Sequence, residues 1–127
     1  MVSLIVLWHL VLLKPRAGLP AAERRRFADA FRRAITAIPS VRGVRFGRRA
    51  IHGAAYELSA PDAAAFVAIV EFEDLGGLHA YLAHPAHDEL GALFGQSLSA
   101  AVVCDFEMLA DSTADLFEVL EPLVDET

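Results

Sequence analysis

The chain has 127 residues, 55% of them hydrophobic, which is the size and composition of a single folded domain. Its single cysteine, Cys104, excludes an internal disulfide framework and a CxxC metal site, and it is typical of a reducing compartment. The formal net charge is −6, and every Lys and Arg lies between Lys14 and Arg49. A helix in that stretch needs its arginines for its solvated face, which argues against nucleic-acid binding.

The chain begins with an apolar run, Met1 to Leu13, in which His9 is the clearly polar group. The run lacks the basic start and cleavage motif of a signal peptide, and it is shorter than the roughly 20 residues that span a membrane. We therefore expect a cytoplasmic protein with a buried strand over residues 4–13. Because both faces of this strand are apolar, it should be central and covered on both sides, by helices and by a second subunit.

A helix is predicted over residues 21–37, with Phe27, Phe31, Ile35 and Ile38 on one face, and Pro39 ends it. An edge strand is expected over residues 41–49, then a loop to residue 63, then a clear strand over residues 65–73.

The second half of the chain continues with two helices and a strand. Asp74 is placed to cap a short helix that ends at Ala83. Pro85 pushes His84 out of helical geometry and opens a second helix, to about Leu98. A last strand follows over residues 101–109. The order β-α-β-β-α-β predicts an α+β, ferredoxin-like protomer, with an antiparallel four-stranded sheet and its helices on one face.

We expect one domain over residues 1–110 and an acidic tail over residues 111–127. The tail carries six acidic residues and no basic ones, with apolar residues on a helical period. A short helix packed on the domain or on a partner, and a disordered tail, are both consistent with this pattern.

Residues 81–88, Tyr-Leu-Ala-His-Pro-Ala-His-Asp, form the densest polar cluster. Tyr81 precedes the proline break and His87 follows it, so both side chains can point into one pocket, where a histidine is suited to proton transfer. Asp105 lies among apolar residues in the last strand and needs a partner, for which a histidine is the obvious choice. The structural alternative is a helix cap and a satisfied polar pair.

The remaining histidines are less informative. His9 lies in an otherwise apolar strand, where a core histidine bonded to a backbone carbonyl is the common explanation. His52 and His79 are expected to be exposed. His84 and His87 lack a third ligand at a telling spacing, so we predict no metal site.

Several segments together resemble the stress-responsive A/B barrel family, the dimeric α/β barrel domains. They are the first strand with His9, the Ile38-Pro39 helix end, Val-Glu-Phe-Glu at 70–73, Tyr-Leu-Ala-His-Pro-Ala-His at 81–87 and Val-Cys-Asp-Phe at 103–106. The resemblance implies a homodimer in which two ferredoxin-like sheets pack face to face and form a β-barrel.

The family includes the plant polyketide cyclase that makes olivetolic acid. The resemblance implies His87 as general base, Tyr81 as its phenolic partner and Asp105 as the carboxylate that orients the base, without a metal or organic cofactor. His9 matches a pocket histidine of that enzyme. Phe31 and Phe66 stand where the cyclase has a pocket tyrosine and histidine, which predicts a more apolar pocket that also includes Phe27.

Three functions therefore stay open: a cofactor-free cyclase, isomerase or lyase acting on a small carbonyl compound, a protein that binds a small apolar ligand without chemistry, and a stress-associated structural dimer. A polar substitution at Val70 or Val103, whichever lies on the free sheet face, is expected to break the dimer. No nucleic-acid or membrane partner is expected.

Overall fold

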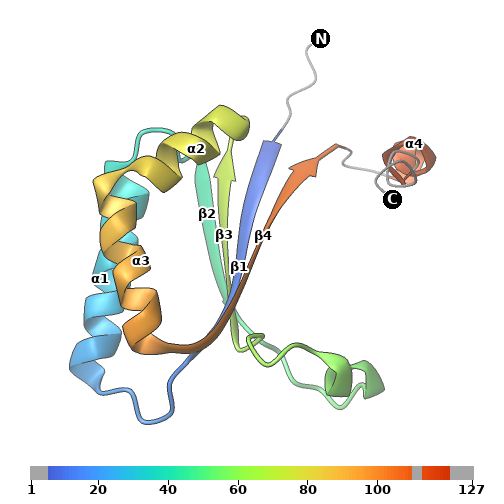
Figure 1. Cartoon of the computed structure of the whole chain (residues 1–127). Coiled ribbons are helices and arrows are strands. Elements are labelled where there is room, and N and C mark those ends of the chain that lie inside the picture. The colour runs from blue at the N-terminus through green and yellow to red at the C-terminus, as the bar shows by residue number, and fades with distance from the viewer. Residues whose placement is uncertain (1–5, 110–112, 121–127) are drawn as a thin grey trace.

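The computed structural model describes residues 6–109 and 113–120. Its strands and helices, in chain order, are β1 (Val6–Pro15), α1 (Ala21–Ala37), β2 (Gly43–Arg48), the 3-10 helix η1 (Ala55–Ser59), β3 (Phe66–Phe72), α2 (Leu75–Ala83), α3 (Pro85–Ser97), β4 (Leu98–Met108), the 3-10 helix η2 (Thr113–Asp115) and α4 (Leu116–Leu120). The predicted β-α-β-β-α-β order is confirmed, with the second helical segment divided into α2 and α3 (Figure 1).

The helix boundaries have local causes. α1 ends at Ala37, and the backbone N–H of Ile38 makes its last helical hydrogen bond just before Pro39. The side chain of Asp74 caps α2 by accepting a hydrogen bond from the N–H of Gly77 at 2.9 Å. His84 caps α3 in the same way, because its Nδ1 accepts from the N–H of Ala86 at 3.0 Å. The break between α2 and α3 is therefore fixed by both Pro85 and His84.

The sheet has the strand order β2-β3-β1-β4, and every neighbouring pair is antiparallel. The apolar first strand is central, as predicted, with β3 on one side and β4 on the other. β2 and β4 are the two edge strands, so β2 lies at an edge as the sequence predicted. The register places His9 of β1 between Val70 of β3 and Asp105 of β4.

The two faces of the sheet differ in what covers them. Every second residue of β1, from Leu7 to Leu13, is buried under α1, α2 and α3, and we call this side the covered face. The core lies there, around Tyr81, Phe72 and Val70. The opposite side carries Trp8, Leu10 and Leu12 of β1, Ile69 of β3, and Val102, Cys104 and Phe106 of β4. No described helix lies on this open face (Figure 1).

The register corrects the expectation about Val70 and Val103. Both residues belong to the covered face, because Val70 pairs with His9 and Val103 with Val11. Val70 is fully buried beneath the helices, so a charge there would test the core and not a dimer. Residues of the open face such as Leu10 replace them as the test positions.

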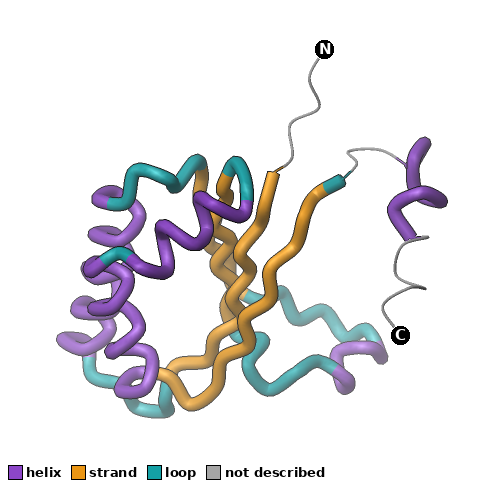
Figure 2. The backbone as a smooth tube through the Cα atoms, turned by 45° about the horizontal axis from the view of Figure 1, so that its top comes forward, coloured by secondary structure: helices purple, strands orange, loops and turns teal. Residues whose placement is uncertain are grey.

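Two segments project beyond the sheet and its helices. The first is the connection between β2 and β3, residues 49–65, which we call the arm and which contains η1. The second is α4, which the structure describes at residues 116–120 of the predicted tail. Both project on the side of the open face, at opposite ends of the strands (Figures 1 and 2). Residues 110–112 and 121–127 of the tail lie outside the described residues.

No helix among the described residues is long and apolar enough to cross a membrane.

Candidate active site

A cavity of about 230 Å³ lies between the covered face and the helices, and we call it the smaller cavity. Its walls come from all four strands and from α1, α2 and α3. Most of the lining side chains are apolar, and His9, Tyr81 and His87 are the polar exceptions. These three side chains give an otherwise apolar cavity a single polar end.

The phenol ring of Tyr81 lies between two imidazoles. Its centroid is 4.8 Å from that of His87 and 5.7 Å from that of His9, with edge-on geometry in both pairs. Tyr81 is buried, yet its hydroxyl makes no hydrogen bond to any described residue. The hydroxyl is therefore available as a hydrogen-bond donor to a molecule in the cavity.

The proline break accounts for the meeting of Tyr81 and His87. Tyr81 lies in the last turn of α2, and His87 lies in the first turn of α3. Because Pro85 and the His84 cap redirect the chain between these two turns, residues six positions apart line the same cavity. This juxtaposition is the one that the sequence predicted.

Asp105 binds a different histidine from the one expected. Its Oδ1 accepts a hydrogen bond of 2.6 Å from Nδ1 of His9, its direct neighbour across β1 and β4. The His87 side chain makes no hydrogen bond among the described residues, so Asp105 does not hold His87 by a hydrogen bond, and its part in catalysis stays a prediction. Asp105 instead holds the imidazole of His9 by a hydrogen bond from its Nδ1–H.

The His9–Asp105 pair is only partly buried. The side chain of His9 is 7% exposed and that of Asp105 is 39% exposed, because β4 is an edge strand that the helices do not cover. The carboxylate can therefore stay hydrated while it holds a buried imidazole. This explains how a charged residue is tolerated in the middle of an apolar strand.

Burial controls the protonation of Tyr81. It raises the pKa of the phenol to about 12, because the anionic form would lose its hydration. The hydroxyl therefore stays protonated at neutral pH and acts as a neutral donor.

The pKa of His87 shifts in the opposite sense. Burial lowers the pKa of His87 below its ordinary value near 6.5, the nearby His9 lowers it further, and Asp88 acts against both. The imidazole of His87 is therefore neutral at pH 7 and has a free lone pair. A neutral imidazole beside a protonated phenol is a base beside a hydrogen-bond donor.

A second cavity of about 470 Å³, the larger cavity, adjoins the first. Phe27 and Phe31 line both cavities, whereas Phe66 lines the larger one alone. His9 lines the smaller one. The four residues predicted to bind substrate are thus divided between the polar end and an apolar extension.

Sequence reasoning missed two residues that line both cavities, Phe46 of β2 and Leu13 of β1. Phe46 contacts the rings of Phe31 and Phe66 at centroid distances of 5.7 and 6.1 Å. The alternation of Val44 and Phe46 was the available signal, since it places both on one face of β2. No group of three or more metal-binding side chains occurs in the part of the chain that the structure describes.

The family model of the stress-responsive A/B barrel domain matches residues 7–108. The chain belongs to this family. The match spans all four strands except for Val6 at the start of β1, includes every residue of the polar end, and stops before α4. No curated protein matches the sequence.

Solved structures share the fold at low sequence identity. A dimeric ferredoxin-like protein from Thermobifida fusca is 19% identical, with a TM-score of 0.64 over 85% of this chain and 95% of that one. Another, from Jannaschia, is 20% identical, with a TM-score of 0.65 over 81% and 99%. The hydroxynitrile lyase of Passiflora edulis is 11% identical, with a TM-score of 0.70 over 87% and 98%. Two of these structures are dimeric by description, and one is an enzyme.

Proposed function

We propose that this protein is a cofactor-free enzyme that transfers protons on a small, largely apolar carbonyl compound. The observation that carries the proposal is the polar end of the smaller cavity. There, the ring centroids of His87, a neutral imidazole, and Tyr81, a phenol without a hydrogen-bond partner among the described residues, lie 4.8 Å apart in otherwise apolar surroundings. Proton transfer by positioned side chains needs this combination and no metal.

In the proposed reaction, the neutral imidazole of His87 removes a proton from the carbon next to the carbonyl group. The carbonyl oxygen gains negative charge and accepts a hydrogen bond from Tyr81. The resulting carbanion attacks a second carbonyl carbon of the same molecule and forms a ring bond. The oxygen of that second carbonyl then takes up a proton, which His87 can return. This is an aldol-type ring closure, and it uses His87 and Tyr81 in the roles that the family resemblance implied.

His9 has a supporting role in this scheme. Asp105 holds its Nδ1–H, and Nε2 makes no hydrogen bond within the described residues. We propose that this second imidazole takes part in proton transfer on the other side of Tyr81, at a ring-centroid distance of 5.7 Å. We infer that Asp105 acts on the reaction through His9.

The walls define the class of substrate. Phe27, Phe31 and Phe46 line both the smaller and the larger cavity. A ligand with its carbonyl group at Tyr81 would therefore extend an alkyl or aryl body between these three rings. The hydroxynitrile lyase among the structural neighbours supports the use of this fold by a lyase.

We further propose that two copies pack open face against open face as a homodimer. The dimeric state of the structural neighbours supports this assembly, and so does the chain's own open face. Phe106 and Val102 are 47% and 39% exposed there, at the edge of a face that is apolar along β1. Burying this surface against a second copy would complete an eight-stranded barrel.

Deuterium exchange into model ketones tests the proposed proton abstraction, and it does not require the natural substrate to be known. Phenylacetone and 2-heptanone in D₂O report, by NMR, any protein-catalysed loss of the proton next to the carbonyl. We expect exchange that falls about 100-fold or more in His87→Gln, since general-base catalysis typically contributes that much. Tyr81→Phe should reduce it about 100-fold through loss of the oxyanion donor.

His79→Gln is the matched control, because His79 is an exposed histidine of α2 outside the cavity. Equal exchange in His87→Gln and His79→Gln would remove His87 from the mechanism. Binding of the ketones without any exchange would instead favour the second candidate function, a non-catalytic binding protein. The apolar lining of the larger cavity supports that alternative.

A further inference from the structure

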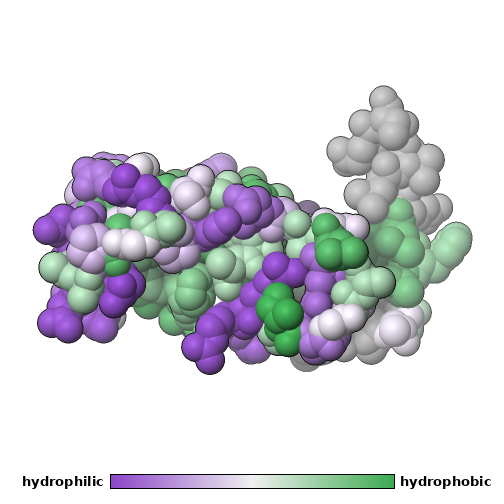
Figure 3. All heavy atoms as spheres, turned by 90° about the horizontal axis from the view of Figure 1, so that it is seen from below, coloured by the Kyte–Doolittle hydropathy of each residue, from purple (hydrophilic) through white to green (hydrophobic). Residues whose placement is uncertain are grey.

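The arm carries exposed apolar side chains that its own domain does not use. Ile51 is 66% exposed, Tyr56 71% and Leu58 92%. Hydrophobic side chains lie at the surface of the arm, whereas the outer side of the helical layer is hydrophilic (Figure 3). Three such residues on one projecting segment mark a contact surface more readily than a single exposed leucine would.

Hydrogen bonds within the arm stabilise its conformation. The carboxylate of Glu57 accepts hydrogen bonds from the backbone N–H groups of His52 and Gly53, at 2.8 and 3.0 Å. The side chain of Arg49 donates to the carbonyl oxygen of Glu57, and the hydroxyl of Tyr56 lies 3.2 Å from Nε2 of His52. The part of the arm that carries Ile51, Tyr56 and Leu58, which we call its tip, therefore has a fixed shape before it binds a partner. This reduces the conformational entropy lost on docking.

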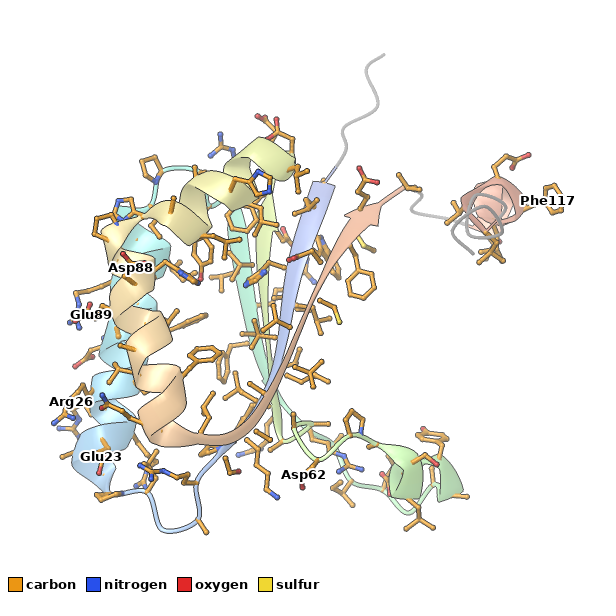
Figure 4. All side chains as sticks on the ribbon, in the orientation of Figure 1. Glu23, Arg26, Asp62, Asp88, Glu89 and Phe117 are labelled. Carbon is orange, nitrogen blue, oxygen red and sulfur yellow. The ribbon has the colours of Figure 1, made fainter. Side chains whose placement is uncertain are left out.

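α4 has the same character at the other end of the sheet. Leu116, Phe117 and Leu120 are all exposed, Phe117 at 75%. Phe117 points away from the sheet of its own protomer (Figure 4). A short helix that leaves its apolar side chains unburied gains little stability from its own fold. α4 also lies beyond residue 108, where the family match ends.

The positions of these segments indicate what they contact. Both project on the side of the open face, the arm at one end of the strands and α4 at the other (Figures 1 and 2). If two open faces meet around a twofold axis that runs across the strands, the ends of the strands are exchanged. The α4 end of one copy then lies beside the arm end of the other.

Charge favours the same pairing. Arg48 and Arg49 are exposed where β2 enters the arm, and the side chain of Arg48 makes no ion pair or hydrogen bond within the described residues. The sequence after residue 110 carries six acidic residues and no basic ones. Glu118 of α4 is one of the six, and it is exposed. The basic pair at the base of the arm is therefore complementary in charge to the acidic tail, although the arm itself also carries Glu57 and Asp62.

We propose that in the homodimer α4 of each protomer packs against the tip of its partner's arm, so that two arm–tail contacts clasp the barrel. The proposal rests on the homodimer proposed above and adds a contact outside the two sheets. It gives the tail of this chain, which the family match does not include, a role in assembly.

Disulfide trapping between two different variants tests the contact directly. In the full-length chain with Cys104→Ser, one protein carries Leu58→Cys and another carries Phe117→Cys. We expect the mixture to form a covalent dimer under mild oxidation, well above either protein alone. Leu75→Cys replaces Leu58→Cys in the control, because Leu75 is 52% exposed on α2, in the helical layer. It should give no such product.

A chain that carries both Leu58→Cys and Phe117→Cys shows whether α4 contacts the arm of the partner or the arm of its own chain. Covalent dimers are expected, and a disulfide confined to single chains would overturn the proposal. In sedimentation experiments, Leu58→Glu and Phe117→Glu should each weaken the dimer about tenfold or more, as loss of a buried apolar anchor does, and Leu75→Glu should not.

Unchanged dimer affinity in both glutamate variants, together with no trapped product, would overturn the clasp and leave the homodimer standing. A wild-type chain that sediments as a monomer would overturn the homodimer itself. Neither result bears on the deuterium exchange that tests the enzyme.

Discussion

The two faces of the sheet are built from one pattern and have different chemistry. Along β1, alternate residues point to opposite sides, and both sets are largely apolar. The covered face includes His9, which joins Tyr81 and His87 at the polar end of a cavity. The open face has Leu10 and Leu12 at its centre. A single central strand thus lines the proposed reaction site on one side and the proposed dimer surface on the other.

The two faces differ in their exposure to solvent. On the covered face, three helices exclude solvent and give a protonated phenol and a neutral imidazole an apolar setting. On the open face, apolar side chains are in contact with solvent in a single protomer, and the proposed homodimer would exclude that solvent. Neighbouring residues of one strand therefore respond to the same substitution in different ways.

The largest expected effect follows from a charge on the covered face. Val70→Glu places an unpaired carboxylate in the core, at a cost of about 3–5 kcal/mol, which is a large part of the stability of a typical domain. We expect loss of the folded state in far-UV circular dichroism and urea denaturation. A variant with wild-type stability would contradict the burial assigned to this face.

The same change on the open face should spare the fold and break the assembly. Leu10→Glu lies one position from His9 along β1, and its side chain points to solvent in a single protomer. We expect a folded protein whose dimer dissociation constant rises about 100-fold, because two carboxylates would be desolvated at the centre of the interface. Analytical ultracentrifugation measures this constant, with Leu10→Met as the volume-matched control. A dimer of wild-type affinity would argue against packing of the open faces.

The smallest effect concerns pH and the covered face alone. Because folding lowers the pKa of His87, the unfolded chain binds its proton more readily than the folded one as pH falls below about 6.5. This contribution to stability is complete above that pH and is lost as pH falls toward the lowered pKa. Thermal melts between pH 7.5 and 5 should show a smaller loss in His87→Gln than in the wild type. His79→Gln should behave as the wild type does, and an equal loss in all three proteins would contradict the shift.

The elements and their order were predictable from the sequence, since they depend on local rules. Pro39 ends α1, Asp74 caps α2, and the His84–Pro85 step separates α2 from α3, each within a few residues of its effect. The first strand is apolar on both faces, which predicted its central position in the sheet. The meeting of Tyr81 with His87 was also predictable, because the two residues are only six positions apart and a known break lies between them.

The identity of the histidine that binds Asp105 could not be predicted from local patterns. The choice depends on the register of β1 against β4, where residues 96 positions apart become direct neighbours. Register also decided which face Val70 and Val103 occupy, since a shift by one residue exchanges the two faces of a strand. The direction in which the arm and α4 project is non-local as well. Local propensity acts over one or two turns of chain, whereas these features depend on pairing across the whole sheet.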